Sequence, residues 1–389
     1  MEPITWRTPK PLLRILGKTL IDWESEELRS AGVERVTVLA ASSRKSQFNE
    51  CGIMDLLEQR QPRGTADAAS SAMTKIHEEL YLQYGDNLLS KNAIERILRS
   101  GRDRLATVGC VRVDDPGRYG VVHARNDGTL EYIEEKPERP SSNLVMAGAF
   151  RFKPEFLSYL DKVTPSARGE LELTDALSLA AKKNEVGVVE INKDDWTDIT
   201  FPWDLLKLNA SLLKTHDSEI LGTIEEGVRI RGPLILGRGS TIRSGSYIEG
   251  PVWIGSGVTI GPNAYLRPFS SIDNYSHLGN ACEIKASILG QRVRVGHLSY
   301  VGDSVISDDV NLGAGTITAN LRFDSETVKV VVNGSKVDTG MVKLGSFIGP
   351  GVKTGVNVSI NPGIRIGADA WVSPGKVVEN DVQPEARYS

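Results

Sequence analysis

The feature that most constrains this chain is an apolar residue that returns at every sixth position through much of its second half. Between Ile224 and Ile284 an isoleucine or leucine occupies each of these positions. Neither an α-helix nor a half-buried strand has this period, but a parallel β-helix does, because each six-residue repeat forms one flat side of a three-sided prism. One coil then takes about 18 residues, and residues one coil apart lie above one another. The sequence therefore predicts a parallel β-helix.

The repeat is interrupted, but not lost, towards the C-terminus. It shifts by one residue near Ile288–Leu289 and again before Ile306. It breaks over 319–343, returns at Ile348 and continues to Val372. We expect the break to be a loop that interrupts the β-helix.

Length and composition limit the remaining possibilities. The chain has 389 residues, more than one hydrophobic core usually serves, so we expect two domains, 1–215 and 216–389. The net charge is -4, from 46 basic and 50 acidic residues, which argues against a nucleic-acid-binding or membrane-surface protein. Three scattered cysteines, Cys51, Cys110 and Cys282, have no metal-binding spacing and suit a reducing cytoplasm. No apolar run approaches the roughly 20 residues of a membrane span, and no signal peptide is visible.

The first half of the chain alternates helix-like and strand-like segments. We expect a helix over Leu20–Ala31, a strand over Arg35–Ala40, a strand over Glu79–Tyr84 and a helix over Asn92–Ser100. This alternation predicts a mostly parallel sheet with helices on both faces, whose ligands bind at the carboxyl ends of the strands. Trp203–Thr215 has the pattern of an amphipathic helix that leads out of this domain.

A series of short motifs runs in order through the same half. These are Thr8-Pro9-Lys10-Pro11-Leu12, Gln59 with Gly64-Thr65-Ala66, Tyr84-Gly85-Asp86, Tyr119-Gly120, Glu135-Lys136-Pro137, Asn143 with Ala147-Gly148, Gly169–Asp175 and Trp196-Thr197-Asp198. The series resembles the sugar-1-phosphate nucleotidylyltransferases over most of residues 1–212. Enzymes of that family join a nucleoside triphosphate to a sugar phosphate and release pyrophosphate.

The resemblance implies roles for particular residues. Lys10 would contact phosphates, Gln59 and Thr65 would hold the base, Asp86 and Asp198 would share a magnesium ion, and Gly120, Glu135, Lys136 and Asn143 would hold the nucleotide or the sugar phosphate. Carboxylate oxygens suit magnesium, and the metal offsets the charge that builds on a transferring phosphoryl group. Taken alone, Asp86 could cap the end of a strand and Lys136 could be a solvated lysine.

The chain departs from this family at two places. The family opens with a buried central strand and a Gly-rich loop whose N–H groups hold the triphosphate, immediately before the segment that matches Met1–Thr5. By this comparison that strand and loop are absent. The stretch Ser42–Gln59 is also shorter than usual and lacks a further strand. We therefore expect nucleotidyl transfer to be lost or severely weakened, the alternative being a misplaced start codon.

In the second half, the candidate site residues follow from the coil length. Lys285 lies one coil after Arg267, so their backbones should stack about 4.8 Å apart. Two stacked cations repel unless an anion lies near them, and either a substrate phosphate or surface carboxylates would meet that need. His297 should lie on another side at about the same level. Its imidazole could take a proton from an attacking amine, although a lone histidine on such a rod is usually a surface or packed residue.

Six polar residues of this half keep a defined spacing: Arg267, Lys285, His297, Tyr300, Asn311 and Asn320. Their spacing resembles the acetyltransferase domain of the bifunctional enzymes that make UDP-N-acetylglucosamine. The resemblance covers about residues 224–380 and is most specific to the archaeal bifunctional sugar-1-phosphate nucleotidylyltransferase/acetyltransferases.

This second resemblance also implies roles. His297 would be the general base that removes a proton from the amine of glucosamine-1-phosphate, Asn320 would position the amine, Arg267, Lys285 and Tyr300 would hold the sugar phosphate, and Asn311 would hold the sugar. Lys329, in the interrupting loop, would contact phosphate. Acetyl-CoA is the implied donor, and backbone N–H groups near Gly345–Gly349 and Gly363 would bind its carbonyl oxygen and pantetheine arm. In the family the site lies between subunits, so we expect a homotrimer.

The fold expected is α/β: an incomplete Rossmann-like nucleotidylyltransferase domain followed by a left-handed parallel β-helix of hexapeptide repeats. The main interpretation is a cytoplasmic enzyme that transfers acetyl from acetyl-CoA to an amino-sugar-1-phosphate, with a nucleotidylyltransferase domain of doubtful activity. One alternative is the full bifunctional enzyme, which uses magnesium and UTP or dTTP. The other is a non-enzymatic regulatory or assembly subunit that binds nucleotide sugars.

Overall fold

The computed structural model describes residues 1–50, 52, 55–59, 61–166 and 168–389, so Cys51 lies outside the described residues. The chain forms two compact units: Met1–Thr19 together with Ile199–Ser389, and Leu20–Asp198. These units are defined by packing and do not divide at residue 215. The domain boundary that we expected there therefore remains a prediction.

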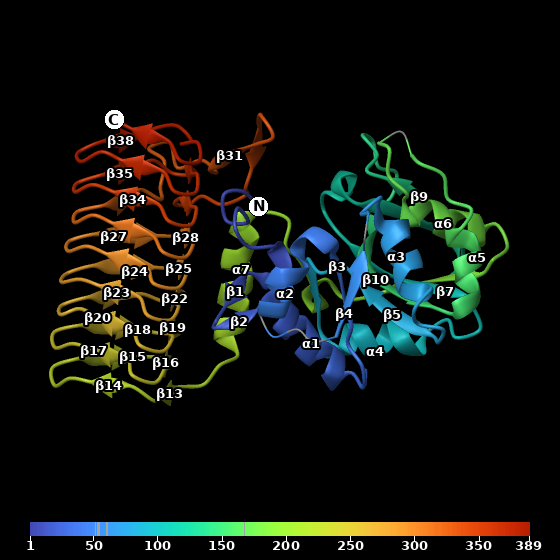
Figure 1. Cartoon of the computed structure of the whole chain (residues 1–389), viewed down its shortest axis with the longest axis horizontal. Helices are drawn as coiled ribbons and strands as arrows, with labels where there is room; N and C mark the ends of the chain where they lie inside the picture. The colour runs from blue at the N-terminus through green and yellow to red at the C-terminus, as the bar shows by residue number, and fades with distance from the viewer. Residues whose placement is uncertain (51, 53–54, 60, 167) are drawn as a thin grey trace. The chain divides into compact units, whose positions relative to one another are not determined.

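The first unit contains a left-handed parallel β-helix with three flat sides, as the six-residue repeat predicts (Figure 1). The first side consists of β13 (Glu219–Ile220), β16 (Leu234–Leu236), β19 (Val252–Ile254), β22 (Ser270–Ile272), β25 (Ile288–Leu289), β28 (Val305–Ile306), β33 (Phe347–Ile348) and β36 (Arg365–Ile366). The second side consists of β14 (Thr223–Ile224), β17 (Thr241–Ile242), β20 (Thr259–Ile260), β23 (His277–Leu278), β26 (Arg294–Val295), β29 (Asn311–Leu312), β34 (Lys353–Thr354), β37 (Trp371–Val372) and β39 (Arg387–Tyr388). The third side consists of β15 (Arg229–Arg231), β18 (Tyr247–Glu249), β21 (Tyr265–Leu266), β24 (Glu283–Lys285), β27 (Tyr300–Gly302), β30 (Ile317–Thr318), β35 (Ser359–Ile360) and β38 (Val377–Val378).

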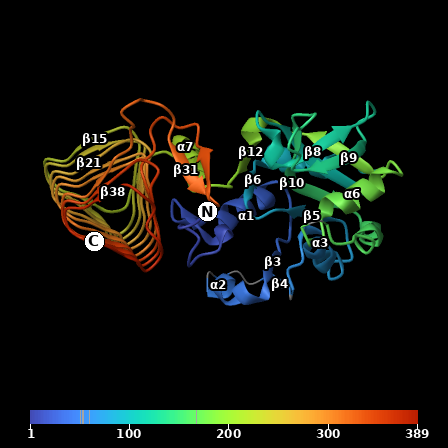
Figure 2. The same cartoon turned by 90° about the horizontal axis from the view of Figure 1, so that it is seen from above.

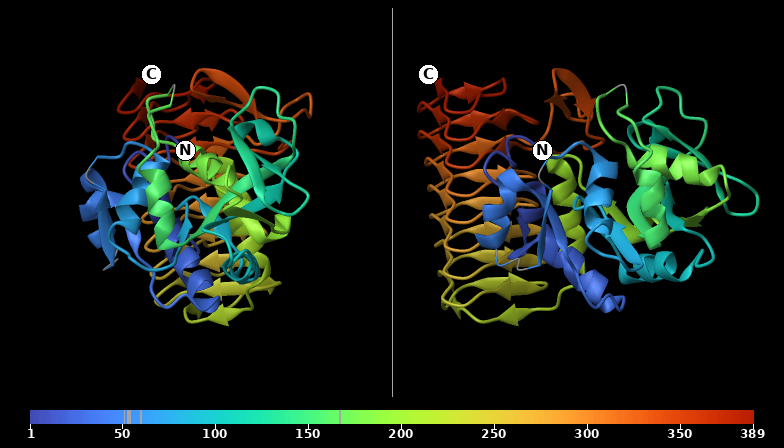
Figure 3. Two further views of the ribbon diagram at one scale, coloured as in Figure 1. Left: turned by 90° about the vertical axis from the view of Figure 1, so that its right-hand side faces the viewer. Right: turned by 45° about the vertical axis from the view of Figure 1, so that its right-hand side comes forward.

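The repeated apolar residues fill the inside of the prism. Ile242, Ile260 and Leu278 pair in register on successive coils and are fully buried. The next partner of Leu278 is Val295, so this coil is one residue shorter, which confirms the shift read near Ile288–Leu289. The coils stack regularly, as the right-hand view of Figure 3 shows. Side chains on the outer faces are therefore placed by coil register.

The break in the repeat is a loop that contains an antiparallel hairpin, β31 (Lys329–Val332) and β32 (Ser335–Asp338). Ile306 pairs directly with Ile348, so the β-helix resumes in register after the loop. The base of the hairpin packs on a later coil, because a Cβ added to Gly363 would lie 2.7 Å from the Val328 side chain.

The first side of the prism is covered by other parts of the same unit. Helix α7 (Pro202–Lys214) carries Asn209, which donates to the carbonyl of Phe269 at 2.9 Å and accepts from the hydroxyl of Ser271 at 2.5 Å. The N-terminal segment, with η1 (Lys10–Leu12), β1 (Arg14–Ile15) and β2 (Lys18–Thr19), is joined to the prism by ion pairs such as Arg14 with Asp273, 3.2 Å apart. Figure 2 shows this segment and α7 beside the prism.

The second unit is built on a sheet in the order β11–β7–β10–β8–β9, with β5 also paired to β10. Its strands are β5 (Leu80–Gln83), β7 (Ala106–Arg112), β8 (Gly120–Ala124), β9 (Leu130–Glu135), β10 (Leu144–Phe152) and β11 (Val186–Glu190). Our expectation of a mostly parallel sheet is wrong for these strands: β11 and β7 are parallel, but β7, β5 and β8 each pair antiparallel to β10, and β8 pairs antiparallel to β9. The long strand β10 lies beside β7 and runs in the opposite direction to β7 and β11.

Helices cover both faces of this sheet, as predicted. One buried cluster includes residues of α3 (Thr65–Met73), α5 (Leu157–Leu160) and α6 (Leu173–Ala181), and the other includes residues of α1 (Leu20–Ser30) and α4 (Lys91–Arg99). Between Ser42 and Gln59, where we expected no further strand, the chain forms α2 (Lys45–Glu50) and β4 (Leu56–Gln59), and β4 pairs in parallel with β3 (Val38–Ala41). No helix in the described part of the chain has the length and apolar character needed to cross a membrane.

Candidate active sites

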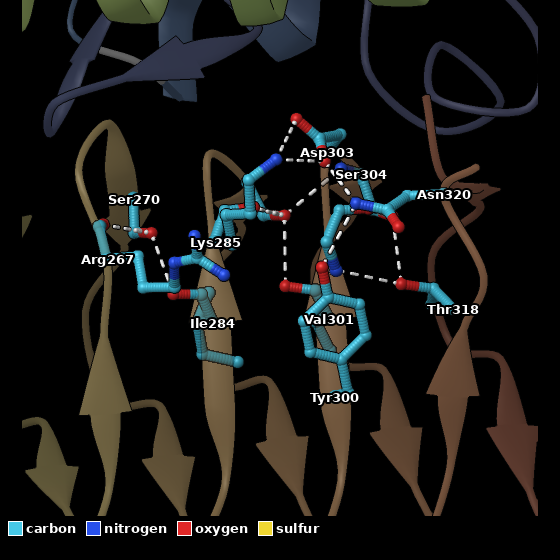
Figure 4. A network of polar contacts seen from close by, with 12 residues as sticks. Arg267, Ser270, Ile284, Lys285, Tyr300, Val301, Asp303, Ser304, Thr318 and Asn320 are labelled. Carbon is cyan, nitrogen blue, oxygen red and sulfur yellow. Dashed lines mark hydrogen bonds and ion pairs between the residues drawn. The ribbon is translucent and has the colours of Figure 1, made fainter. Parts of the chain in front are cut away.

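A polar network lies where the third-side strands end, near the middle of the β-helix (Figure 4). Lys285 Nζ donates to both carboxylate oxygens of Asp303, at 2.9 and 2.6 Å. Asn320 Nδ2 donates to the same carboxylate and, at 3.0 Å, to Tyr300 Oη. The side chains of Lys285 and Asp303 are only 17% and 10% exposed. We call Arg267, Lys285, Tyr300, Asp303 and Asn320 the third-side cluster.

The coil register explains why these residues meet. Lys285 pairs with Gly302 on the next coil, one residue before Asp303. Gly302 has no side chain in the way: an added Cβ would lie 2.4 Å from Tyr300 Oη and 2.8 Å from Asn320 Nδ2. The ring of Tyr300 can therefore lie along β27, and its hydroxyl reaches the end of that strand at Gly302. Burial, followed by the charge of Asp303, raises the pKa of Tyr300 further above neutral pH, where a tyrosine hydroxyl is already protonated.

Arg267 lies one coil below Lys285, as predicted, since its N–H donates to the carbonyl of Ile284 at 2.9 Å. Each of the two stacked cations has its own carboxylate. Arg267 Nη1 lies 2.9 Å from Glu283 Oε1, and Lys285 is bound to Asp303. Surface carboxylates, one of the two alternatives that we left open, therefore offset the repulsion in this structure.

His297 lies at the corner between the second and third sides, directly after β26, and its side chain is exposed. Its Nδ1 accepts a long hydrogen bond, 3.3 Å, from the N–H of Asn280. The ring fits closely over the preceding coil, because a Cβ on Gly279 would lie 2.9 Å from Nδ1. The imidazole is thus accessible and held at one nitrogen by the backbone.

The structure does not join His297 and Asn311 to the third-side cluster. No hydrogen bond or ion pair among the described residues connects them, and the three residues of β27, about 10 Å of strand, separate His297 from Asp303. Asn311 is exposed on β29 of the second side. Lys329 is exposed at the start of the insertion hairpin, opposite Asp338, and also lies outside the cluster.

The backbone groups that we expected to bind acetyl-CoA are already engaged. The N–H groups of Gly345, Gly349 and Gly363 donate to carbonyl oxygens of Asp303, Ile366 and Gly345 at 2.9, 2.8 and 2.7 Å. These bonds belong to the ladder of backbone hydrogen bonds between successive coils, and nearly all buried backbone groups are paired in this way or another. That expectation is wrong for these three positions.

In the second unit, strand pairing brings the two proposed metal ligands together. β6 (Asn87–Leu89) pairs antiparallel with β12 (Trp196–Asp198), so Asp198 lies opposite Asn87, the neighbour of Asp86. Asn87 Nδ2 donates to Asp86 Oδ1 at 3.0 Å, and Tyr119 Oη donates to Asp198 Oδ2 at 2.9 Å. The described residues contain no group of three or more His, Cys, Asp or Glu side chains suited to a metal. Two carboxylates fit magnesium, which takes its other oxygens from phosphates and water.

Three of the proposed phosphate-binding residues lie beside this pair. Gly120 and Glu135 are opposite each other on β8 and β9, and the N–H of Lys136 donates to the carbonyl of Tyr119 at 3.0 Å. Tyr119, which the sequence analysis quoted but did not assign, links these residues to Asp198. At Gly120 an added Cβ would lie 2.5 Å from the terminal methyl group of Met146, so a larger residue there would displace the end of that side chain.

The other four residues that we expected to bind the nucleotide or the sugar phosphate lie in different parts of the protein. Gln59 Nε2 donates to Asp67 Oδ2 at 2.7 Å, the N–H of Leu173 donates to Thr65 Oγ1 at 2.9 Å, and Arg112 Nη1 donates to Asn143 Oδ1 at 2.8 Å. Among the described residues these contacts do not connect them with the Asp86–Asp198 pair. Lys10 belongs to the other compact unit.

Sequence reasoning also missed Asp303 and Glu24. Asp303 follows Lys285 by one coil, so the same arithmetic that paired Arg267 with Lys285 had a signal for it. Glu24 lies on α1 and is 6% exposed, and its Oε1 has no hydrogen-bond partner among the described residues. Burial, followed by the charge of Asp86, raises its pKa well above the ordinary value. Nothing in the local pattern of α1 indicates a buried acid.

Known proteins resemble the chain over nearly its whole length. The nucleotidyl transferase family model matches residues 1–215. The bifunctional sugar-1-phosphate nucleotidylyltransferase/acetyltransferase of Sulfurisphaera tokodaii is 43% identical over 98% of this chain and 95% of the relative. The bifunctional protein GlmU of Methanocaldococcus jannaschii is 37% identical over 92% of this chain and 87% of the relative. The low-salt glycan biosynthesis nucleotidyltransferase Agl11 of Haloferax volcanii is 29% identical over 81% of this chain and 90% of the relative.

These comparisons favour the full bifunctional enzyme over our main interpretation, in which the first domain has lost nucleotidyl transfer. They do not support the interpretation as a non-enzymatic subunit. The chain is a transferase, and it belongs to the family of bifunctional sugar-1-phosphate nucleotidylyltransferase/acetyltransferases.

Proposed function

We propose that this chain transfers an acetyl group from acetyl-CoA to the amine of glucosamine-1-phosphate and also joins a sugar-1-phosphate to a nucleotide. The observation that carries the acetyl-transfer half is the third-side cluster. It presents a lysine, an amide and a protonated tyrosine hydroxyl around one nearly buried carboxylate. Arg267 and Lys285 supply positive charge for the sugar phosphate, and Asn320 supplies an amide oxygen that can accept from the amine.

His297 is the proposed general base. The amine nitrogen attacks the thioester carbonyl carbon, the carbon–sulfur bond breaks, and the coenzyme leaves as a thiolate, while the imidazole takes the proton that the amine loses. A neutral imidazole has only one acceptor nitrogen. For Nε2 to take the proton, the ring hydrogen must lie on Nδ1, which breaks the bond from Asn280. That bond is 3.3 Å long, so its loss costs little.

A second copy of the chain would complete this site. His297 and Asn311 lie on one edge of the prism and the third-side cluster on another, so a single copy presents the two parts separately. In a rotationally closed assembly one surface of each copy meets a different surface of its neighbour at every interface. We propose that the edge with His297 and the edge with the third-side cluster are the surfaces that meet. We therefore retain the homotrimer as part of the proposal.

The nucleotidyl-transfer half rests on the Asp86–Asp198 pair with Gly120, Glu135 and Lys136 beside it. Magnesium held by the two carboxylates would offset the charge of the transferring phosphoryl group. Tyr119 orients Asp198 through its 2.9 Å hydrogen bond, and Lys136 lies where it can contact a phosphate. UTP and dTTP are the candidate nucleotides.

A paired assay tests both halves. One arm follows CoA release from acetyl-CoA with glucosamine-1-phosphate, and the other follows pyrophosphate release from UTP or dTTP with a sugar-1-phosphate and magnesium. We expect both signals. His297→Ala should abolish only the first and Asp86→Asn only the second, so each variant is the control for the other. CoA release that survives in His297→Ala would overturn the assigned base, and absence of pyrophosphate release would return the account to a lone acetyltransferase.

Three parts of the proposal rest on the sequence. A cytoplasmic location follows from the scattered cysteines, of which Cys110 and Cys282 are free and buried. Neither a nucleic-acid nor a membrane partner is expected from the charge balance. Glucosamine is preferred to galactosamine by family resemblance alone, and the ratio of kcat/KM for the two sugar phosphates decides between them.

A further inference from the structure

Asp303 is the residue that holds the third-side cluster together (Figure 4). Its carboxylate accepts hydrogen bonds from both Lys285 Nζ and Asn320 Nδ2. The side chain of Asp303 is only 10% exposed. The proposed acetyl transfer gives roles to the lysine and the amide, but none to the carboxylate that both of them contact.

The backbone holds Asp303 in a fixed place. The residue lies at a corner of the prism where the chain is left-handed, with φ 48°, and Ala286 occupies the same corner one coil earlier with φ 44°. The N–H of Asp303 donates to the carbonyl of Lys285, and its carbonyl accepts from the N–H of Gly345, both at 2.9 Å. Aspartate and asparagine adopt this conformation more readily than most other non-glycine residues. Asp303→Asn should therefore change the chemistry of the side chain and preserve the corner.

The contacts of Asn320 determine which way its amide faces. A carboxylate can only accept hydrogen bonds, so the amide nitrogen, and not the amide oxygen, must face Asp303. This nitrogen has two hydrogens, and both are used, one toward Asp303 and one toward Tyr300 Oη at 3.0 Å. The amide oxygen, Oδ1, has no hydrogen-bond partner in the part of the chain that the structure describes. Asn320 therefore presents an acceptor, and no donor, to a ligand.

The same carboxylate restricts Lys285. An ammonium group has three hydrogens, and Nζ lies 2.9 and 2.6 Å from the two oxygens of Asp303, so one hydrogen remains for a ligand. The charge of Asp303 also offsets the charge of the lysine. The pair therefore attracts a phosphate less strongly than an unpaired lysine would.

We propose that Asp303 is a positioning residue that makes the acceptor site selective for an amine. It acts through Asn320: because Asp303 holds the amide nitrogen, Oδ1 is left to accept a hydrogen bond from the amine of the sugar phosphate. This inference rests on the proposed acetyl transfer. A ligand without a hydrogen to donate at that position would leave Oδ1 unpaired in a partly buried site, which is unfavourable. In Asp303→Asn the new amide can donate to Oδ1 of Asn320, so the Asn320 amide can turn over and the selectivity is lost.

The test measures the amine preference, which we define as the ratio of the affinity for glucosamine-1-phosphate to the affinity for 2-deoxyglucose-1-phosphate. In the second ligand hydrogen replaces the amine, and the phosphate is the same. Calorimetry on the full chain gives both affinities without turnover. Asp303→Asn should lower the amine preference by roughly three- to tenfold, the contribution of one hydrogen bond. It should not weaken the binding of 2-deoxyglucose-1-phosphate, because the charge of Lys285 is no longer offset.

A double-variant cycle tests whether Asp303 acts through Asn320. Asn320→Ala removes the amide and should lower the amine preference by a similar factor. If the two residues act as one unit, adding Asp303→Asn to Asn320→Ala should lower the preference no further. Losses that multiply in the double variant would mean that Asp303 contacts the amine itself, and they would overturn the positioning role.

Asp309→Asn is the matched control. Asp309 also lies at a left-handed corner of the prism, with φ 61°, and it is paired with a cation of the preceding coil, Arg292, at 2.6 Å. Its loss should leave both affinities unchanged. Thermal unfolding of each variant checks that the protein is folded under the conditions of the measurement.

The outcomes separate failure of this inference from failure of the proposed function. A wild type that prefers the amine but releases no CoA would refute acetyl transfer and leave the role of Asp303 standing. If Asp303→Asn kept the wild-type preference, or lost affinity for both ligands equally, the inference would be overturned. A wild type that bound the two ligands equally would overturn it as well.

Discussion

Two places on the β-helix, one on the second side and one on the third, carry the same kinds of cation in opposite surroundings. On the third side Arg267 and Lys285 each face a carboxylate, and the Lys285–Asp303 pair is nearly buried. On the second side Lys353 and Arg387 face the indole of Trp371, and no carboxylate among the described residues pairs with them. A paired cation is held in a fixed position from which it can contact a ligand, whereas a cation without a carboxylate partner keeps its charge unneutralised. The two sides are thus suited to different tasks, positioning an acceptor and attracting a donor.

The largest effect expected is at the corner between these two sides. His297→Ala should lower kcat for acetyl transfer by about 10²–10⁴-fold, because a positioned general base is lost. The affinity for CoA should not change, because the imidazole acts on the amine of the acceptor. Steady-state kinetics and calorimetry measure the two quantities. A variant that kept most of its kcat would show that this corner has no base.

The next largest effect should follow from breaking the third-side pair. Asp303→Asn leaves a largely buried Lys285 without its carboxylate, and we expect it to lower the free energy of unfolding by roughly 2–3 kcal/mol. Asp309→Asn is the matched control, because its pair with Arg292 is exposed and should matter by less than about 1 kcal/mol. Chemical denaturation compares them. Equal losses would mean that burial does not distinguish the two kinds of pair.

Glu24 in the second unit is the converse case, a buried carboxyl that pairs with no cation in the part of the chain that the structure describes. Its pKa is raised in the folded protein, so the folded state keeps a proton that the unfolded chain has lost. Stability should fall as pH rises from the ordinary value of 4.5 towards the folded pKa, by up to about 1.4 kcal/mol per pH unit. Glu24→Gln, which is always neutral, should remove this fall and be more stable than wild type at pH 7.

Unfolding curves recorded from pH 5 to pH 8 measure this difference. Glu34→Gln, an exposed position in the same unit, is the control and should leave the pH dependence unchanged. If wild type and Glu24→Gln respond to pH alike, the carboxyl is not the buried acid described here.

The smallest expected effect is that of salt. Added salt screens exposed charges more strongly than partly buried ones. The KM for acetyl-CoA should therefore rise several-fold between about 0.05 and 0.5 M salt, and the KM for glucosamine-1-phosphate should rise less, because Lys285 is 17% exposed. If the KM for glucosamine-1-phosphate rose more than the KM for acetyl-CoA, the assignment of donor and acceptor to the two sides would be reversed.

The β-helix was predictable because its geometry follows from local arithmetic. A fixed coil length places Arg267 below Lys285, and even the one-residue shift near Ile288–Leu289 appears as a shorter coil. The same arithmetic did not reveal which cations are paired. The coil length places Asp303 one coil after Lys285, but the contacts that make it important depend on the reach of the lysine and amide side chains, which a repeat pattern does not encode.

The second unit was less predictable because its site depends on pairings between distant segments. Asp86 and Asp198 meet only because β6 pairs with β12, more than a hundred residues later in the chain. Family resemblance identified these two residues, whereas the alternation of segments gave the wrong strand direction for β10. Gln59 could be quoted as a motif residue, but its bond to Asp67 depends on the turn into α3.

The most direct test of the central claim is complementation between two inactive variants. His297→Ala removes the base on one edge of the prism, and Asn320→Ala removes the amide of the third-side cluster on the other. If each site combines edges of two copies, mixed assemblies of the two variants should recover acetyl transfer in up to about a quarter of their sites. Activity that rises well above that of either variant alone is the predicted result. Mixed assemblies that remain inactive would contradict a site shared between copies.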